Sequence, residues 1–436
     1  MKRVLVLMLA VLVFVSCSEE QSPEVKKAIE DLDVLIEKAE AIHPDLYKYT
    51  SKETFDSKVN QVKSSFETGD QVEFYRLVAP IFASLGDGVT ELEPMTEYFI
   101  RQIKKGDNFF PYEVEFEDGR LFVYKSYVES NKVPEGAEII SIDGIKTEVV
   151  YQEMTDYVSG LTSTEKDRKL TERFQQLYFI LYGSKELMDL EYVANDHVKT
   201  LSVQTAGIDD TLQAPIQNMP SYTYEVIDSG LAKISIHQFH GFIGFKQFME
   251  ATQKKILDDD IDTLVIDLRD SIGGNNKYNE YLMSLVTDIP FRLYGDITAK
   301  VSKEVLSANK NMKANYSDNV GELVRPIIND ELRPFKQVKP FEGDVYVVVN
   351  SETLNEASEF AALIKDYGVA TLIGQETGSN PSSFKSEFIT TTPNLQMKLM
   401  IPYQYYLRPS GENTKKGVVP DVISDQPLQY ILDNRN

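Results

Sequence analysis

Residues 345–378 of the 436-residue chain read VYVVVNSETLNEASEFAALIKDYGVATLIGQETG. The run of valines with one tyrosine at its start is short and β-branched enough for a buried strand. The stretch from Glu356 to Tyr367 has the pattern of a helix, and Thr353 or Asn355 can cap its first turn. A turn between such a strand and helix can present a nucleophile beside the amides of the helix N-terminus. The same residues also fit plain helix capping, so this stretch alone indicates a fold and leaves its chemistry open.

A second stretch of the same kind, residues 264–276, reads LVIDLRDSIGGNN. Its first three residues are apolar and predict another buried strand. Gly273 and Gly274 follow, where glycines allow the backbone to approach a ligand and exposed amides can stabilise an oxyanion. The alternative is a tight turn without a ligand. A phosphate site is disfavoured, because the Lys-Ser/Thr ending of a P-loop is missing after these glycines.

Outside these stretches the spacing of apolar residues changes twice along the chain. Residues 23–92 repeat apolar side chains at helical spacing, and residues 109–205 contain short alternating runs typical of strands. From Tyr222 onward, apolar strands alternate with helical segments. The pattern predicts an α+β multidomain fold. We expect a short linker and helical N-terminal region over 17–105, a β domain over 106–210 and an αβ domain over 222–436.

The composition narrows the possible partners and cofactors. The chain carries 68 acidic against 45 basic side chains, a formal net charge of −23. Because nucleic acid requires a basic face, this acidity argues against it as a partner. The single cysteine, Cys17, cannot close an intrachain disulfide and excludes a cysteine-based zinc site. We expect no metal and no cofactor. The four histidines are His43, His197, His237 and His240.

Residues 1–16 have the features of a signal peptide, with a basic start and an apolar run from Val4 to Val15 that is too short to span a bilayer. Ser16 and Cys17, followed by acidic residues, resemble a bacterial lipoprotein signal, in which the cysteine is lipidated. An ordinary secretory signal with an unrelated cysteine is the alternative. The lipoprotein interpretation places the protein in the bacterial cell envelope, anchored by lipid to the outer membrane. The acidic residues after Cys17 favour its outer surface.

Several motifs occur in an order that resembles the tail-specific, or carboxyl-terminal processing, serine peptidases, including their tricorn-core-like branch. Residues 264–274 are similar to the family's Asp-Leu-Arg-Asn-x-Gly-Gly element, and residues 345–378 to its strand, nucleophile turn, helix and following loop. The segment 86–90 resembles its Gly-Asp-Gly-His-Thr motif, 134–144 the carboxylate loop of its PDZ-like domain, and 417–421 its closing Gly-Val-x-Pro-Asp. The resemblance implies a PDZ-like domain at 106–210 and a crotonase-like peptidase domain at 222–436.

The chain departs from the family at the positions that carry catalysis. Val89 stands where the branch has its histidine base, and a valine cannot accept a proton. An ungapped register places Asn355 at the nucleophilic serine, and an amide cannot serve as an activated alkoxide. The same register places Asn380 where other branches have a lysine base. The resemblance therefore implies that neither the Ser-His nor the Ser-Lys arrangement survives.

Other residues could restore the chemistry. A shifted register would make Ser358 the nucleophile, and Ser382 and Ser383 lie on the loop after position 380. His237 and His240 follow a predicted strand in a segment that the family places near its substrate cleft. More simply, these histidines are turn or surface residues.

Three functions follow from this reading. The first is a lipid-anchored protein of tail-specific-peptidase architecture that is catalytically degenerate and binds a peptide or an unfolded protein segment, a carboxyl terminus being one such segment. The second is an active serine-type endopeptidase with a displaced nucleophile, with the amides of Gly273 and Glu356 as its oxyanion hole. The third is a scaffolding lipoprotein whose groove binds nothing.

Overall fold

The computed structural model describes residues 21–129, 132–211, 220–326 and 331–435. Cys17 and the predicted signal peptide at 1–16 lie outside the described residues. The described chain combines helices with three sheets, which confirms the predicted α+β multidomain class.

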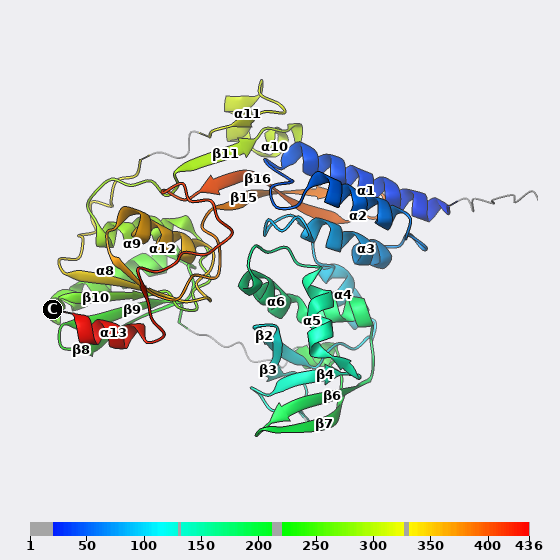
Figure 1. Ribbon diagram of the computed structural model, residues 1–436, viewed down its shortest axis with the longest axis horizontal. Coiled ribbons are helices and arrows are strands. Elements are labelled where there is room, and N and C mark those ends of the chain that lie inside the picture. The colour runs from blue at the N-terminus through cyan, green and yellow to red at the C-terminus, as the bar shows by residue number, and fades with distance from the viewer. Residues whose placement is uncertain (1–20, 130–131, 212–219, 327–330, 436) are drawn as a thin grey trace, which may run out of the picture.

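Three helices form the N-terminal region, as the helical spacing predicts: α1 (Pro23–Ile42), α2 (Lys52–Lys63) and α3 (Gln71–Ala83) (Figure 1). Each begins after a polar capping residue whose side chain accepts a backbone N–H of the first turn. The capping residues are Ser22 for α1, Ser51 for α2 and Asp70 for α3. Such caps satisfy donors that have no partner inside the helix. Their apolar faces pack together through side chains such as Leu32, Phe55 and Phe74.

The next region is an antiparallel sheet with helices packed on it. Its strands run in the order β2-β3-β4-β6-β7, with the short β5 paired to β4. The strands are β2 (Tyr112–Glu117), β3 (Arg120–Ser126), β4 (Glu138–Ile142), β5 (Ile145–Lys146), β6 (Leu187–Ala194) and β7 (His197–Gln204). The helices are α4 (Thr96–Lys104), α5 (Thr147–Thr155), α6 (Ser163–Tyr182) and the short α7 (Ile208–Thr211). This region holds the predicted β domain, and its PDZ-like character stays a prediction.

The C-terminal region is built on a sheet of order β17-β14-β13-β10-β9-β8, in which only β8 runs antiparallel to its neighbour among the described strands. The strands are β8 (Tyr222–Asp228), β9 (Leu231–Ile236), β10 (Thr263–Asp267), β13 (Asp344–Val349), β14 (Thr371–Gly374) and β17 (Val422–Ile423). Every residue of β10 is buried, including the apolar run 264–266 that the sequence predicts as a buried strand.

Helices cover both faces of this sheet. On one face, α8 (Phe242–Asp258), α9 (Asn276–Val286) and α12 (Glu356–Tyr367) share one apolar cluster with the strands. On the other face, Ile431 of α13 (Pro427–Asn434) packs against Val265 and Val348. Parallel strands covered on both faces place their carboxyl ends, and the turns that follow them, along one edge of the sheet.

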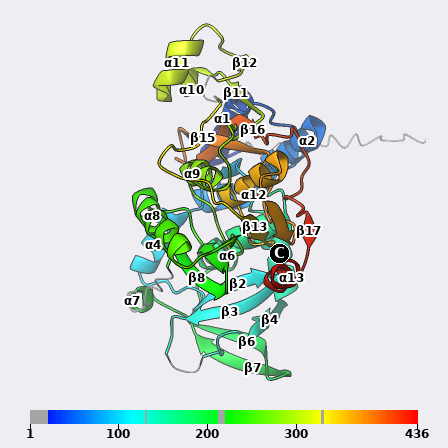
Figure 2. The ribbon, with the colours of Figure 1, turned by 90° about the vertical axis from the view of Figure 1, so that its left-hand side faces the viewer.

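A third sheet joins the N-terminal region to the C-terminal region of the chain. Its order is β1-β16-β11-β12, with β15 paired to β16, and the strands are β1 (Glu91–Leu92), β11 (Asp296–Lys300), β12 (Leu323–Val324), β15 (Ser383–Thr391) and β16 (Lys398–Leu407). The short helices α10 (Lys303–Ala308) and α11 (Lys310–Tyr316) extend from it. In both ribbon views this sheet lies above and the β2–β7 sheet below (Figures 1 and 2). A strand of the predicted helical region thus pairs with a strand of the predicted αβ domain.

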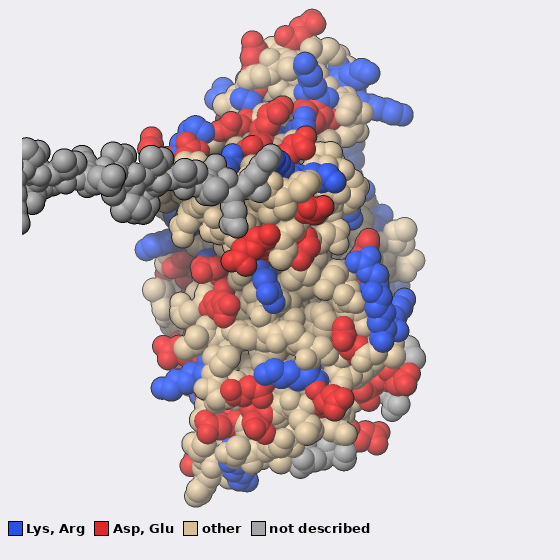
Figure 3. All heavy atoms as spheres, turned by 90° about the vertical axis from the view of Figure 1, so that its right-hand side faces the viewer, with Lys and Arg blue, Asp and Glu red and all other residues tan. Residues whose placement is uncertain are grey.

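The described surface and core show two further features. The face drawn in Figure 3 carries acidic and basic side chains interspersed.

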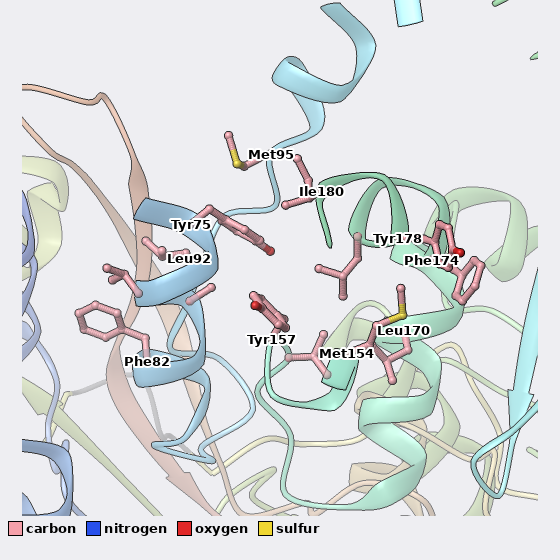
Figure 4. Packing of buried hydrophobic residues seen from close by; sticks show 14 of the residues in the cluster. Tyr75, Phe82, Leu92, Met95, Met154, Tyr157, Leu170, Phe174, Tyr178 and Ile180 are labelled. Carbon is pink, nitrogen blue, oxygen red and sulfur yellow. The ribbon is translucent and has the colours of Figure 1, made fainter. Parts of the chain in front are cut away.

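In the interior, α3 packs against the segment after α5, where the rings of Tyr75 and Tyr157 stack with centroids 6.0 Å apart, and Leu170 and Phe174 continue the cluster along α6 (Figure 4). This packing fixes α6, whose N-terminal end faces the start of α12 across the cavity described below.

Phe360 of α12 is fully buried against the parallel sheet, and its truncation tests whether this helix depends on that packing. Removing a buried aromatic ring leaves a cavity and costs about 3–5 kcal/mol. We therefore expect Phe360→Ala to lower the free energy of unfolding by that amount, measured by urea unfolding followed by circular dichroism. Ile243→Ala, at a side chain of α8 that is 77% exposed, is the control and should stay within about 0.5 kcal/mol of the parent. Equal losses in both variants would contradict this packing.

Candidate functional site

A cavity of about 500 Å³ lies where α6, the turn at residues 86–90, the start of α12 and β15 meet. Its walls are strongly charged. Glu165, Arg168 and Lys169 come from α6, and Glu356 and Glu359 come from the first turn of α12. Because these elements belong to the N-terminal, middle and C-terminal parts of the chain, the cavity exists only in the complete fold.

Val89, Asn355 and Asn380 all line this cavity, although they are far apart in the sequence. The three positions that the resemblance aligns with catalytic residues are therefore neighbours of one cavity. Their equivalence to a nucleophile and two bases stays a prediction. Val89 has an apolar side chain, and Asn355 and Asn380 have amides. None of these side chains takes up or releases a proton near neutral pH.

Asn355 occupies the turn between β13 and α12 with φ of 50° and ψ of −126°. A non-glycine residue with positive φ is uncommon, and strain of this kind persists only where the surroundings impose it. Here the backbone N–H of Asn355 donates to Ser379 Oγ at 2.6 Å, and its Nδ2 donates to the carbonyl of Ile272 at 3.1 Å. The turn is thus anchored by side chains and backbone from two separate loops.

The predicted capping of α12 is wrong for both candidate residues, each of which lies in the described part of the chain. Asn355 is the N-cap residue, but its side chain makes no cap hydrogen bond because it points to Ile272. Thr353 Oγ1 donates instead to the carbonyl of Leu268 at 2.8 Å. Both side chains tie the turn to the neighbouring strand end, and the helix start is left to backbone geometry.

The predicted oxyanion amides of Gly273 and Glu356 lie close together, and the adjoining amide of Gly274 has an anionic partner. Gly274 donates its backbone N–H to Glu356 Oε2 at 2.8 Å. Gly273 has φ of 71°, and a Cβ at that position would lie 2.6 Å from the nitrogen of Glu356. Only glycine permits so close an approach. A substrate oxyanion at Gly274 would have to displace the Glu356 carboxylate.

Lys385 lines the same cavity as Glu356 and was not singled out from the sequence. Its Nζ forms an ion pair with Glu359 and lies 3.7 Å from Glu356 Oε1, while Tyr294 donates its hydroxyl to Glu359 Oε2 at 2.7 Å. Burial lowers the pKa of Lys385, but the two carboxylates outweigh it and raise this pKa above its ordinary value. Burial raises the pKa of Glu359. Lys385 is therefore protonated and cannot accept a proton as a general base.

The side-chain amide of Asn380 holds its loop in place through two hydrogen bonds. Its Nδ2 donates to the carbonyl of Thr414, and its Oδ1 accepts the backbone N–H of Ser382 at 2.8 Å. Both ends of the amide are thus satisfied within the loop. A lysine at this position would lose the second of these contacts, because an ammonium group cannot accept a hydrogen bond.

The serines proposed to restore activity fall into two groups. Ser358 and Ser382 are fully buried, and their hydroxyls donate to the carbonyls of Thr353 and Glu412, each at 2.7 Å. Ser383 lines the cavity, as does Ser379, which the sequence reasoning overlooked. The hydroxyl of Ser379 accepts from Asn355 and donates to Ser358 at 3.0 Å, so it supports the turn.

The histidines do not join these serines. Among the described residues that line the cavity there is no histidine; the backbone carbonyl of His237 accepts the N–H of Ile272, so this segment flanks the glycine loop without lining the cavity. His43 is buried behind the 86–90 turn, with Nε2 3.0 Å from Asp87 Oδ2, and Asp87 in turn accepts the backbone N–H groups of Val89 and Thr90. The aspartate of this turn therefore holds its backbone in shape.

Glu165 is a partly buried carboxylate of the cavity, in the first turn of α6. Thr162 caps α6 by accepting the N–H of Glu165 at 3.1 Å, and the Glu165 carboxylate accepts the N–H of Leu161 at 2.7 Å, an arrangement close to a capping box. Thr162 also donates to the carbonyl of Gly378 at 2.6 Å, which joins α6 to the C-terminal region. Burial raises the pKa of Glu165.

Within the described ranges there is no cluster of three or more histidine, cysteine, aspartate or glutamate residues that could hold a metal ion. No helix in the described part of the chain is both long and apolar enough to cross a bilayer.

Comparison with known proteins identifies the family of the C-terminal part of the chain, which supplies one side of this site. Residues 230–424 match the family described as peptidase family S41, so the chain contains an S41 peptidase domain that carries β9 to β17. The predicted resemblance to this class of peptidases is confirmed for that domain.

Solved structures with the same fold include mature CPAF complexed with lactacystin, at 14% identity over 92% of this chain and 94% of that one, with a TM-score of 0.68. Mature CPAF alone is similar at 15% identity over 94% and 96% of the two chains, with a TM-score of 0.66. The photosystem II D1 C-terminal processing protease matches at 14% identity over 93% and 94%, with a TM-score of 0.48. At these identities the likeness to the two CPAF structures is one of fold.

The raised pKa of Glu165 gives stability a pH dependence whose sign is defined. Because the folded state raises this pKa above the ordinary value of about 4.3, the folded state is favoured when the group is protonated, and this contribution is lost as pH rises through the folded pKa. We expect Glu165→Gln, which keeps an acceptor for Leu161, to be more stable than the parent near pH 7. The advantage should shrink as pH falls toward about 4.3.

Urea unfolding at several pH values measures this difference, with Glu135→Gln at an exposed position as the control. A constant difference across pH, or a loss of stability in Glu165→Gln near neutral pH, would contradict the desolvation of this carboxylate.

Proposed function

We propose that this protein binds a peptide or an unfolded protein segment in the cavity between α6 and α12 and does not cleave it. The observation that carries the proposal is the composition of the turn and its surroundings. Asn355 stands at the strained strand-to-helix turn, and Val89 and Asn380 stand on the walls around it. None of these side chains is an activated nucleophile or a general base.

The contacts of Glu356 support the same conclusion. Acyl transfer requires donors that are free to receive a developing oxyanion. Here the N–H of Gly274, beside the predicted donors Gly273 and Glu356, is bonded to the Glu356 carboxylate, and that carboxylate is in turn neighbour to the protonated Lys385. The site is organised around a resident negative charge, which opposes the formation of a second one.

The cavity itself suits a peptide. It is open, of about 500 Å³, and lined by both backbone and charged side chains of each sign. A peptide offers matching amides and charges, and the S41 domain belongs to a family of peptidases, whose substrates are peptides and proteins. A carboxyl terminus held by strand addition in the PDZ-like region is one form that the ligand could take.

An active peptidase with a displaced nucleophile is the competing function. Ser358 and Ser382 argue against it because their hydroxyls are buried and bonded to carbonyls. Ser383 is the member of the predicted set that lines the cavity, and Lys385 two residues later is ion-paired. Ser383 therefore lacks a described base, although it is the serine to examine first.

The two functions are separated by a labelling and a binding measurement on the purified protein. We expect no labelling by a fluorophosphonate probe and no cleavage of denatured casein, because the nucleophile and base are missing. We expect fluorescently labelled peptides from a carboxyl-terminal library to bind, as measured by anisotropy. Ser383→Trp, which fills the cavity, should weaken that binding by about tenfold or more.

Ser307→Trp, at an exposed position on α10, is the matched control and should bind as the parent does. Probe labelling that disappears in Ser383→Ala would instead establish the displaced nucleophile. Binding that survives Ser383→Trp, or no binding by any peptide, would remove this cavity as the ligand site.

We further propose that the chain is anchored by lipid at Cys17 to the bacterial outer membrane, facing the cell exterior. The support is the sequence: a signal-like segment over residues 1–16 ends at the single cysteine, and acidic residues follow it. A lipid anchor would bring an acidic protein of net charge −23 to a membrane without a basic patch.

Replacing the lipidated thiol tests this localisation. We expect Cys17→Ser to move the protein from the membrane fraction to the soluble fraction and to abolish incorporation of labelled palmitate, because no thioether can form. A variant that stays in the membrane fraction would favour an ordinary signal or another attachment. Protease treatment of intact cells would show whether the parent is on the outer surface.

A further inference from the structure

We propose that Asn355 is a self-modification site, where the backbone nitrogen of Glu356 attacks the side-chain amide and converts asparagine to aspartate or isoaspartate through a cyclic imide. The proposal rests on the backbone at Asn355, with φ of 50° and ψ of −126°, and on the contacts of its side chain. It concerns reactivity of the chain itself and does not depend on whether the cavity binds a peptide.

The value of ψ decides which atoms are close. Viewed along the Cα–C bond of an L-residue, Cβ is rotated by about 120° from the backbone nitrogen. A ψ near −120° therefore brings Cβ into line with the nitrogen of the next residue. At the ψ of −126°, Cβ of Asn355 and the nitrogen of Glu356 are therefore almost eclipsed. A five-membered imide ring needs this nearly planar arrangement. Most asparagines must leave their native helix or strand geometry to reach it, whereas here the fold imposes it.

The side chain is directed to the same place. Nδ2 of Asn355 donates to the carbonyl of Ile272, and the next residue, Gly273, is so close to Glu356 that a Cβ on it would lie 2.6 Å from the Glu356 nitrogen. The side-chain amide of Asn355 and the nitrogen of Glu356 thus both neighbour residues 272–273. A backbone that already aligns Cβ with the attacking nitrogen removes part of the entropic cost of reaching the near-attack arrangement.

The remaining requirements are a free nitrogen and access for water. Glu356 is the first residue of α12, and the first N–H groups of a helix have no acceptor within that helix. Asn355 is exposed at the mouth of the cavity, so water can reach it. The Gly274–Glu356 contact restrains the following side chain and keeps the turn in place.

The chemistry balances with water as the one co-reactant. The Glu356 nitrogen loses its proton and bonds to Cγ of Asn355, and the Cγ–Nδ2 bond breaks as the amide nitrogen leaves with a proton as ammonia. Water then opens the ring at either carbonyl. Opening at the backbone carbonyl yields isoaspartate, and opening at the side-chain carbonyl yields aspartate. Either product places a new carboxylate beside Glu356 in an already acidic cavity.

The experiment compares the folded and unfolded protein over the same incubation in mildly alkaline buffer. Peptide mass spectrometry follows the mass gain of amide-to-acid exchange at Asn355, with an isoaspartate methyltransferase assay and hydroxylamine cleavage to detect isoaspartate and imide. We expect deamidation at Asn355 to be faster in the folded protein than in the urea-unfolded chain by about tenfold or more. Asn195, in the exposed turn between β6 and β7 with φ of 53°, and Asn315 of α11 provide internal references.

Asn355→Gln is the control, because its longer side chain cannot form the five-membered ring, and it should show neither imide nor mass gain at this position. A rate in the folded protein equal to or below that in urea would overturn the proposal. Chain cleavage after Asn355 would also overturn it, since that product requires attack by Nδ2 on the residue's own carbonyl and a different backbone geometry.

Discussion

The close packing of the 350–356 turn between two glycine-containing loops is the constraint on which the rest of this structure depends. On one side a Cβ on Gly273 would crowd the nitrogen of Glu356, and on the other a Cβ on Gly378 would overlap the carbonyl of Ser351. The backbone also bonds across both contacts, from Leu354 to Ser271 and from Gly378 to Thr353. Because the turn cannot relax, Asn355 keeps its unusual backbone and α12 starts at the cavity wall.

Much of this architecture follows from local sequence, and the reason is physical. Residues 264–266 and 345–349 are apolar and β-branched because they lie in a parallel sheet covered on both faces, and α12 spans the residues that its pattern predicts. The neighbourhood of Val89, Asn355 and Asn380 could be anticipated because each belongs to a motif of a recognisable order. The capping of α12 could not, since tertiary contacts draw Thr353 and Asn355 away from the helix.

The contacts between the charged residues of the site could also not be predicted from the sequence. Glu356 bonds to Gly274 from 82 positions away, and Lys385 joins Glu359 across a strand and a helix. Such pairs carry no local pattern, because what brings them together is the pairing of distant strands. Their energetic role differs from that of a surface ion pair: removal of one partner would leave a charge in a poorly hydrated place.

The pairing of β1 with β16 has a consequence for how this protein can be divided. The S41 domain begins at residue 230, yet Glu91 and Leu92 complete one edge of β16, and Asp31 of α1 accepts the backbone N–H groups of Asn394 and Leu395 in the turn before it. A fragment trimmed to the domain's borders would expose part of a strand edge and unpaired amides, which favour association with other chains. The segment that matches the family in sequence is therefore smaller than the part of the chain that is needed to pair all its strand edges.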